Sequence, residues 1–483
     1  MAITRRQFIK RTGLISAGAF LGPSFFRNPF LRQAMAANLD SLDRYFVVVF
    51  LDGGNDGLNT VTPIANGSSG TLRAAYEAAR NTGNGGLQLL PGDLAATHIG
   101  TDLSSGTPLA VHPGLIGLKH LWDQGALAVI QGCGDPVSLN FLSHDYSRGT
   151  WQTGNPSGVL GYPGGWVGRY LVAAGYGGSD IPGVNIRDSV APEFAQTSTS
   201  VLALNQVGDF QFPYDGQYPG DVAFKRMGFF NLCNNAVSAA QPTMQYVGSS
   251  GQATLNASES YPPLSDTYVN DRPSFNQAYD NLGTGFADDL REVAKVIYGV
   301  KSGVPNIKAR SFELSNGGYD THSDQGTTGA NDQQNQLHHE VGDALEAFYN
   351  DCADMGVANK LCVIIWSEFS RRIQQNANGT DHGSQGPVFV IGGPSTGGGR
   401  LVGGVYGNHP NINDGALNDD GNSVYSQASL DPFRSTDIRD VYGTILKHWL
   451  GITDPSLLLP FDTGDPSVNW VYPNYNFDLP FLT

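Results

Sequence analysis

The sequence predicts an α/β fold in which a mostly parallel sheet carries helices on both faces and a loop-rich insertion interrupts the chain. Two patterns support this prediction. Short, continuous runs of apolar and β-branched residues, typical of strands buried on both faces, alternate with segments whose apolar residues recur at helical spacing. The chain is also long enough, at 483 residues of which 40% are hydrophobic, to bury a sizeable core.

Five runs are predicted to be strands because each is apolar, short and bounded by glycine or polar residues. They are residues 45–51 (YFVVVFL), 126–132 (ALAVIQG), 309–315 (ARSFELS), 361–367 (LCVIIWS) and 387–393 (PVFVIGG). Strands that are separated by helices favour parallel pairing, since the chain crosses over the sheet between them.

Four further segments are predicted to be helices, because their apolar residues lie three or four positions apart, as on one face of a helix. They are residues 112–125, 284–299, 335–356 and 435–451. Residues 178–282 differ, because they are rich in Gly, Ser, Asn, Pro and Tyr and show little periodicity. We predict a partly loop-like insertion there, within a single domain that comprises residues 37–483.

The first 36 residues have the features of an export signal. Arg5 and Arg6 precede an apolar stretch, residues 13–26, and the sequence AMAA at 34–37 offers a cleavage site between small residues. This arrangement resembles a twin-arginine signal peptide, which implies recognition by the twin-arginine translocase and a periplasmic or extracellular mature protein. A membrane anchor is the alternative, but an apolar stretch of 14 residues that a proline interrupts is too short for a stable span.

The charge balance excludes one large class of partner. The formal net charge is −16, and it becomes −22 when cleavage after residue 36 removes six basic residues and no acidic one. Because a nucleic-acid binder needs a basic face to neutralise phosphates, we expect no nucleic-acid partner. An acidic surface suits cation binding instead.

The cysteines give no sign of a zinc knuckle or a dithiol redox motif. Cys133, Cys233, Cys352 and Cys362 are the four cysteines, and no two of them form a C-x-x-C pair. Cys352 and Cys362 flank a predicted helix–strand connection. They either form a disulfide in an oxidising compartment or remain separate buried thiols.

Acidic residues and histidines gather where the predicted strands begin or end. In an open parallel sheet, ligands bind at the carboxyl ends of the strands. Taken singly, each candidate has a simpler explanation as a turn former, a helix cap, a surface ion pair or a core histidine. Taken together, they predict a site for a divalent metal ion, with zinc, manganese and calcium all open. The predicted metal ligands are Asp52, Asp320, His322, Glu368, Asp381 and His382.

Ser143 and His144 are the predicted catalytic pair. They stand at the start of a predicted helix after the strand at 126–132, and a helix N-terminus stabilises an oxyanion. Ser138 and Thr60 are alternative nucleophiles. A purely structural alternative is that Ser143 caps the helix.

The motifs LDGGNDGLNT, GGYDTHSDQ, SEFSRR and GTDHG together resemble an exported bacterial family catalogued as domain of unknown function 1501. The resemblance covers nearly the whole mature chain. The order of the acidic and histidine residues is also similar to the alkaline phosphatase superfamily, which includes phosphatases, arylsulfatases and cofactor-independent phosphoglycerate mutases. The resemblance implies an alkaline-phosphatase-like fold, export in the folded state and metal-dependent chemistry at an anionic ester.

Two alignments with that superfamily are possible. In the first, Asp381 and His382 are the superfamily's Asp-His pair, and His409 is its last histidine. In the second, which we favour, Glu368 takes the place of the strand-end aspartate and His382 is the last histidine, because a predicted strand follows it at the expected distance.

Two hypotheses for function follow. The first is a metal-dependent hydrolase of phosphate or sulfate esters, small or linked to glycans, in which Arg371 or Arg372 holds the anionic group. The second is an exported binding or assembly module that keeps the scaffold with reduced catalytic machinery. Two features favour the second. They are Phe369, where the superfamily has a histidine, and the lack of a clearly defined nucleophile. Phe369 and the single residue between Asp320 and His322 also leave open whether the site holds two metal ions, one or none.

Overall fold

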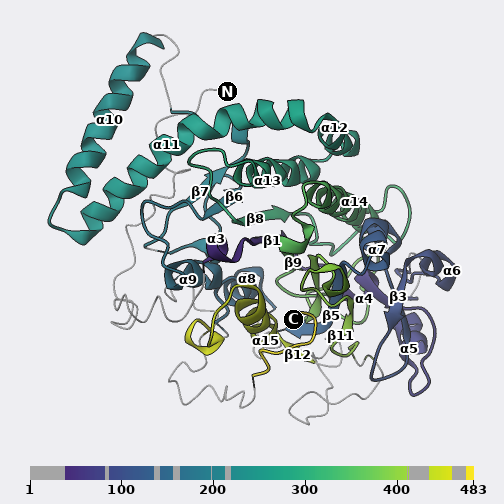
Figure 1. The fold of residues 1–483 in the computed structure, drawn as a ribbon. Helices are drawn as coiled ribbons and strands as arrows, with labels where there is room; N and C mark the ends of the chain where they lie inside the picture. The colour runs from purple at the N-terminus through teal and green to yellow at the C-terminus, as the bar shows by residue number, and fades with distance from the viewer. Residues whose placement is uncertain are drawn as a thin grey trace. The chain divides into compact units, whose positions relative to one another are not determined.

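Helices flank a large, mostly parallel sheet, which confirms the predicted α/β class (Figure 1). The structure is a computed structural model, and the predicted signal peptide and Ser138 lie outside the residues that it describes. Those residues are 38–81, 86–134, 142–155, 164–196, 198–212, 219–410, 412, 435–459 and 475–483.

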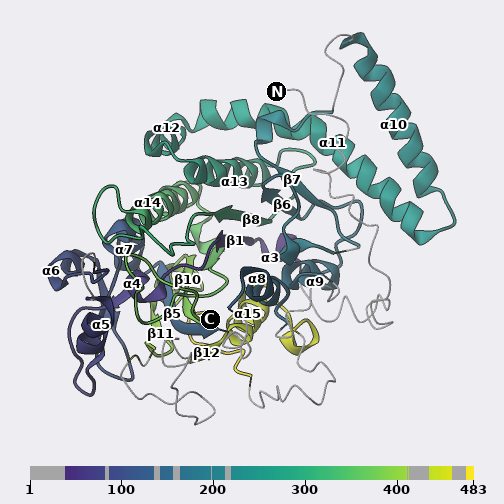
Figure 2. The same ribbon diagram turned by 180° about the vertical axis from the view of Figure 1, so that it is seen from behind.

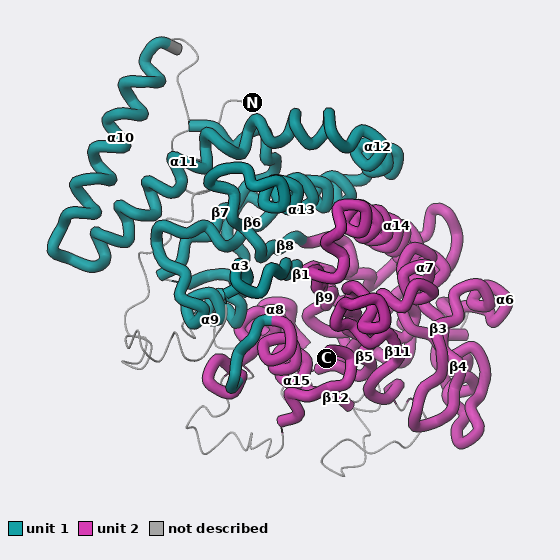
Figure 3. The backbone as a smooth tube through the Cα atoms, in the orientation of Figure 1, with its two compact units in different colours: residues 1–47, 161–314, 450–454 teal, residues 48–160, 315–449, 455–483 magenta. Residues whose placement is uncertain are grey.

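The chain divides into two compact units, which are coloured separately in Figure 3. Unit 1 comprises residues 1–47, 161–314 and 450–454, and unit 2 comprises residues 48–160, 315–449 and 455–483. The division falls inside two strands, β1 (Tyr45–Leu51) and β8 (Ser311–Asn316). Each unit therefore contains a part of both strands.

Unit 2 contains the strands beside which the candidate residues stand. Besides its parts of β1 and β8, these strands are β5 (Leu127–Gly134), β9 (Leu361–Trp366), β10 (Gly386–Gly392), β11 (Gly404–Tyr406) and β12 (Thr436–Asp437). The order is β11-β5-β10-β9-β1-β8, and β12 pairs with β5. All five runs predicted as strands are strands of one sheet, with small shifts at their ends.

Within this sheet, β10 runs against both of its neighbours. It pairs antiparallel with β5 and with β9, whereas β11 and β12 pair parallel with β5. Gly386, the first residue of β10, therefore lies opposite Cys133, near the end of β5. The chain just before β10 consequently stands at the same edge of the sheet as the chain just after β5 and β9.

Aromatic side chains pack the helix that follows β5 against the edge of the sheet where β5 and β9 end. Trp151 of α8 (His144–Thr153) is buried against Trp366, the last residue of β9, with nearly parallel rings whose centroids are 5.3 Å apart. Trp366 also stacks on Phe50 of β1, at a centroid distance of 4.5 Å. Stacked aromatic pairs stabilise a fold beyond the area that they bury, so these rings fix the position of α8.

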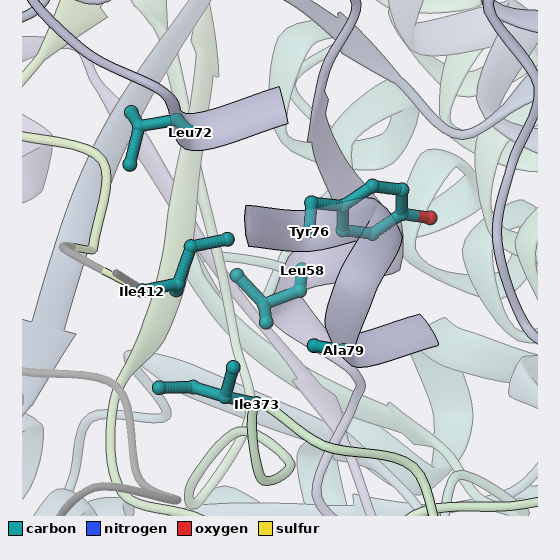
Figure 4. Packing of buried hydrophobic residues seen from close by; sticks show 6 residues of the cluster. All are labelled: Leu58, Leu72, Tyr76, Ala79, Ile373 and Ile412. Atoms are coloured by element: carbon teal, nitrogen blue, oxygen red, sulfur yellow. The ribbon is translucent and has the colours of Figure 1, made fainter. Parts of the chain in front are cut away.

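A small core anchors the chain that follows β1. Asp56 caps α4 (Gly57–Thr60) and forms a fully buried ion pair with Arg80 at the end of α5 (Leu72–Arg80). Apolar side chains of both helices pack together in one buried cluster (Figure 4). They are Leu58, Leu72, Tyr76 and Ala79, together with Ile373 and Ile412.

The other elements of unit 2 include a second sheet of order β2-β4-β3. Its strands are β2 (Val61–Pro63), β3 (His98–Thr101) and β4 (Pro108–Val111). The helices are α6 (Pro91–Leu94), α7 (Ile116–Asp123), α14 (Gln333–Asp354) and α15 (Ile438–Thr444), which a π-helical turn (Ile445–Trp449) extends. The 3-10 turns are Ala95–Thr97, Pro113–Leu115, Ala358–Lys360, Ser395–Gly397 and Pro455–Leu457. Three of the four predicted helices correspond to α7, α14 and α15.

Unit 1 contains its parts of β1 and β8 followed by β6 (Gly183–Ile186) and β7 (Val201–Leu204), in the order β1-β8-β6-β7. β6 pairs parallel with β7 and with β8. The helices are α3 (Leu39–Leu42), α9 (Trp166–Ala173), α10 (Val222–Val237), α11 (Pro242–Asp271), α12 (Pro273–Leu282) and α13 (Gly285–Lys301). The 3-10 turns are Pro192–Phe194, Val207–Asp209 and Pro219–Asp221. The fourth predicted helix, at 284–299, is α13.

The prediction of a loop-like insertion is wrong for residues 222–282, most of which form α10, α11 and α12. Both ribbon views show α10 and α11 packed as a long helical pair (Figures 1 and 2). A Cβ atom at Gly248 of α11 would lie 2.5 Å from the backbone nitrogen of Val237 and 2.6 Å from the carbonyl oxygen of Cys233, both on α10. This glycine therefore permits close helix packing, although in the sequence it resembles a helix breaker.

Two further expectations concern cysteines and membranes. Cys133, Cys233, Cys352 and Cys362 are all free and buried, and Cys352 and Cys362 form no disulfide with each other. Among the described helices, none is long and apolar enough to cross a membrane.

Candidate metal centre

Residues from three parts of unit 2 meet at the edge of the sheet described above. Asp320 and His322 follow β8, His382 precedes β10 and His144 begins α8. Ligand atoms of His144, Asp320 and His382 all lie within 4.8 Å of one another. His322 joins them, because its Nε2 atom is 2.9 Å from Nε2 of His382. Three of the predicted metal ligands thus lie together with His144, which the sequence placed in a catalytic pair.

The carboxylate of Asp320 is the centre of this cluster. Its Oδ1 atom is 3.3 Å from Nε2 of His322 and 3.3 Å from Nε2 of His382, and its Oδ2 atom is 3.4 Å from Nε2 of His144. Donor atoms that share one ion, each roughly 2.1 Å from it, lie about 3.0 to 3.4 Å apart at octahedral or tetrahedral angles. The distances of the three Nε2 atoms from the Asp320 carboxylate are therefore those of neighbouring donor atoms on one divalent ion.

The other ring nitrogen of each histidine is bound to a group that can only accept a hydrogen bond. Nδ1 of His144 donates to Oε1 of Glu368 at 2.8 Å, and Nδ1 of His382 donates to the carbonyl oxygen of Leu142 at 2.9 Å. Nδ1 of His322 donates to Oδ1 of Asp381 at 3.1 Å. Histidines that bind a metal are held in this way, with the ring oriented by a carboxylate or carbonyl behind it.

These outer hydrogen bonds determine what the Nε2 atoms present to Asp320. Because Nδ1 carries the proton in each neutral ring, Nε2 carries a lone pair. The Nε2 atoms of His322 and His382 then point lone pairs at each other across 2.9 Å, beside a carboxylate oxygen. Electron pairs that converge so closely repel one another unless a proton or a metal ion lies between them.

Protonation of the individual rings differs with their surroundings. Burial lowers the pKa of His382, which favours its neutral form, the form that binds metal ions. The hydrogen bond to Glu368 raises the pKa of His144. The side chains of Asp320 and His322 are 48% and 47% exposed, so the cluster is open to solvent on their side.

Glu368 lies behind His144, one step away from Asp320. Its side chain is fully buried, and its two carboxylate oxygens accept hydrogen bonds from the backbone N–H groups of Gly53 and Gly54 at 3.1 to 3.3 Å. The hydroxyl of Ser367 donates to it as well, at 3.1 Å. Glu368 therefore joins the loop after β1 to the histidine that begins α8.

Arg371 is also turned inward. Its side chain is fully buried and donates to four backbone carbonyl oxygens as well as to Oδ1 of Asp320, at 2.6 Å. Partial burial by itself would raise the pKa of Asp320, but the hydrogen bond and charge of Arg371 outweigh this and lower the pKa to about 2. The Asp320 carboxylate is therefore held ionised and fixed in orientation.

Asp52 and Arg148 lie beside the cluster. The backbone carbonyl of Asp52 accepts from the N–H of Tyr319 at 3.2 Å, which places Asp52 next to the segment that carries Asp320. An Nη2 atom of Arg148, one turn after His144 on α8, is 3.5 Å from Oδ1 of Asp52. The sequence analysis missed Arg148, although its spacing of four residues from His144 on a predicted helix places the two side chains on one face.

The alternative candidates fall in other positions. Thr60 is fully buried, and its hydroxyl donates to the carbonyl oxygen of Asp56 at 2.7 Å. Its other polar neighbours are Asn55 and His338, neither of which belongs to the cluster. His409 is also buried and binds the carbonyl oxygen of Pro410 through Nδ1. Ser143 occupies the N-cap position of α8 and is exposed, but its side chain makes no capping hydrogen bond.

Comparison with known protein families matches one part of the chain. The match is to the family described as "Protein of unknown function (DUF1501)", and it covers residues 305–455. None of the curated proteins compared matches the chain.

The matched range contains most of the candidate centre. Asp320, His322 and His382 lie within the matched range, as do the buried Glu368 and Arg371. His144 and Arg148 lie before it. The cluster is therefore completed by a helix that the family match does not cover.

Proposed function

We propose that this chain binds a zinc ion through Asp320, His322, His382 and His144 and uses it to hydrolyse a phosphate or sulfate ester outside the cytoplasm. The observation that supports the proposal is the convergence of three imidazole Nε2 atoms on one carboxylate, with each Nδ1 held from behind. The order of the site segments along the chain also supports a relationship to the alkaline phosphatase superfamily.

The donor set favours zinc over the other ions that the sequence left open. Imidazole nitrogens suit zinc and neighbouring transition metals, whereas calcium takes oxygen ligands almost exclusively. Manganese prefers more carboxylates than the one that Asp320 supplies. Three imidazoles and one carboxylate therefore fit zinc best.

The residues around the cluster have distinct parts in this proposal. A zinc ion bound there would act as a Lewis acid that polarises the ester. Glu368 and Asp381 orient His144 and His322, and Arg371 fixes the Asp320 carboxylate. Because Asp320 and His322 are about half exposed, a small or glycan-linked anionic ester can reach the cluster from solvent.

Metal content tests the binding step. Elemental analysis of the purified protein should find about one zinc ion per chain, and His322→Ala and His382→Ala should each lower it strongly, because each removes a donor atom. His120→Ala is the matched control: this histidine is exposed, pairs with Glu346 and lies away from the cluster. A wild-type protein without transition metal would contradict the proposal.

Activity tests the chemical step. The zinc-loaded protein should cleave an activated aryl phosphate or aryl sulfate, and His382→Ala should abolish cleavage while His120→Ala retains it. A protein that holds zinc but cleaves neither ester would support the alternative function, an exported binding or assembly module. That alternative draws on one observation: among the described residues, no hydroxyl is hydrogen-bonded to Nε2 of His144, His322 or His382.

Export is the third part of the proposal, and it draws on the sequence of the first 36 residues. Replacement of both Arg5 and Arg6 by lysine should leave the full-length precursor in the cytoplasm, because the twin-arginine translocase reads the arginine pair. Cell fractionation followed by immunoblotting measures this. Normal amounts of the double variant in the periplasm would show that the export route has been assigned wrongly.

A further inference from the structure

A hydrolase for phosphate or sulfate esters needs a positive group that meets the anion, and Arg371 does not supply it. The guanidinium of Arg371 is fully buried and already donates to four backbone carbonyls and to Asp320. The sequence predicted that Arg371 could bind the anion, but its buried position conflicts with that prediction. Arg372, the other arginine that the sequence offered, donates through its backbone N–H to the carbonyl oxygen of Asp381. A further cation, Arg148, stands on the His144 side of the cluster.

Arg148 has the required position. It follows His144 by one turn of α8, so the two side chains project from the same face of the helix, with Cβ atoms roughly 5 to 6 Å apart. The side chain of Arg148 is 32% exposed, and its guanidinium carbon lies 6.0 Å from the centre of the Phe50 ring. The guanidinium thus stands near the metal cluster with access to solvent.

The hydrogen-bonding capacity of Arg148 is largely unused. Nε is buried and has no hydrogen-bond partner within the described part of the chain. The contact of Nη2 with Asp52 is 3.5 Å long, beyond ordinary hydrogen-bond distance, and the Asp52 side chain is 41% exposed. An ion pair of this kind contributes little to stability. By contrast, Arg439 is buried and donates to Asp437 at 2.7 and 2.9 Å.

We propose that Arg148 binds the tetrahedral oxyanion of the substrate, the phosphate or sulfate group of the ester. The planar guanidinium can donate two parallel hydrogen bonds to such a group, and its orientation is set by Phe50 and Asp52. This inference rests on the proposed function and names the group that distinguishes its substrates.

The surrounding charges make this arginine necessary. Asp52 and Asp381 have partly exposed carboxylates beside the cluster, and the chain as a whole is acidic. These charges repel an approaching anion. Loss of Arg148 should therefore weaken anion binding while the donor atoms of the cluster stay in place.

Isothermal titration of zinc-loaded protein with inorganic phosphate, and separately with sulfate, tests the inference. Arg148→Gln should raise the dissociation constant of the preferred anion about ten- to a hundredfold, as expected for lost charge-assisted hydrogen bonds. Arg148→Lys, which keeps the charge and loses the fork, should fall between Arg148→Gln and the wild type. Arg400→Gln should bind as the wild type does, because Arg400 donates to the backbone of Thr483 at the chain end.

Zinc content, measured on every variant, separates this inference from the proposed function. Equal zinc content in the wild type and Arg148→Gln, with weaker anion binding in the variant, supports both. Equal anion binding in Arg148→Gln and the wild type overturns the role of Arg148 and leaves the zinc site standing. If the wild type holds no zinc, the proposed function fails. In that case the phosphate and sulfate titrations of the metal-free protein test the role of Arg148. That role is overturned if Arg148→Gln binds the anions as the wild type does. It is also overturned if neither protein binds phosphate or sulfate.

Discussion

At the scale of single residues, the candidate centre depends on hydrogen bonds behind the histidines as much as on the histidines themselves. Glu368 receives two backbone N–H groups and Nδ1 of His144 in a fully buried position. It therefore determines which nitrogen of His144 faces Asp320. Groups of this kind usually matter nearly as much to metal affinity as the ligands do.

Glu368→Gln tests this. In the variant, the amide NH2 group replaces a carboxylate oxygen that accepts hydrogen bonds in the wild type, and it cannot accept them. His144 should then lose its fixed orientation. Buried N–H groups that donate to Glu368 should lose their acceptor. We expect zinc affinity to fall roughly ten- to a hundredfold and the free energy of unfolding to fall by about 1 to 3 kcal/mol. Competition with a chromophoric chelator and urea denaturation measure the two effects. Unchanged zinc affinity would show that Glu368 has no orienting role.

The sequence indicated the residue types of the centre better than their arrangement. Asp320, His322 and His382 were identifiable as candidate ligands because they stand at strand ends. Glu368 was identifiable as a site residue, but no sequence pattern tells whether a carboxylate faces a metal ion or the back of a histidine. Arg371 shows the same limit, because its burial depends on carbonyl groups from distant segments.

At the scale of elements, strand positions were predictable and strand directions were not. The run at 387–393 is apolar in either direction, so its antiparallel pairing as β10 could not be read from the pattern. The helices at 222–282 were missed for a related reason. Glycine has a low helix propensity, but the tight contact of α11 with α10 through Gly248 overrides that local preference.

Two glycines of this helical pair allow a matched comparison. Gly248→Ala should destabilise the protein by about 1 to 3 kcal/mol, because the new Cβ meets the backbone of α10. Gly228→Ala on α10 should stabilise it by roughly 0.5 to 1 kcal/mol, because nothing lies within 4 Å and alanine favours the helix. Urea denaturation of both variants measures the difference. Equal effects of the two substitutions would mean that the close approach of the helices is not a constraint.

At the scale of the whole molecule, unit 1 buries acidic groups that the proposed function does not use. Glu193 and Glu313 have no exposed surface, and their carboxylate oxygens have no hydrogen-bond partner in the described residues. Burial raises the pKa of both, and the neighbouring Glu193 raises that of Glu313 further, although Arg187 lies 3.3 Å from Glu313. Burial, aided by Asp288, also raises the pKa of Asp289 to about 7.

The contribution of these acids to stability should therefore fall as the pH rises. The folded protein binds protons at these groups at pH values where the unfolded chain, with pKa values of roughly 4, has released them. Their contribution to the free energy of unfolding then decreases from about pH 5 to beyond pH 7. Buried histidines whose pKa burial lowers, such as His112, contribute with the opposite sign at acidic pH. Denaturation at several pH values measures this, and Glu193→Gln should flatten the decrease, while Glu77→Gln, an exposed control, should not. The same pH dependence in Glu193→Gln as in the wild type would contradict the assignment of buried protonated acids.

The direction of β10 also has a consequence for the time course of folding. His382 reaches Asp320 only when β10 has inserted between β5 and β9, and His144 arrives with a helix from much earlier in the chain. Such pairings between distant segments form slowly. The zinc-binding side chains should therefore come together only after the slow pairing of these segments.

Zinc should leave the refolding rate unchanged and lower the unfolding rate, because it stabilises contacts that are absent from the transition state for folding. Stopped-flow experiments with zinc and with a chelator measure the two rates. Faster refolding with zinc would mean that the zinc-binding side chains come together before the transition state for folding.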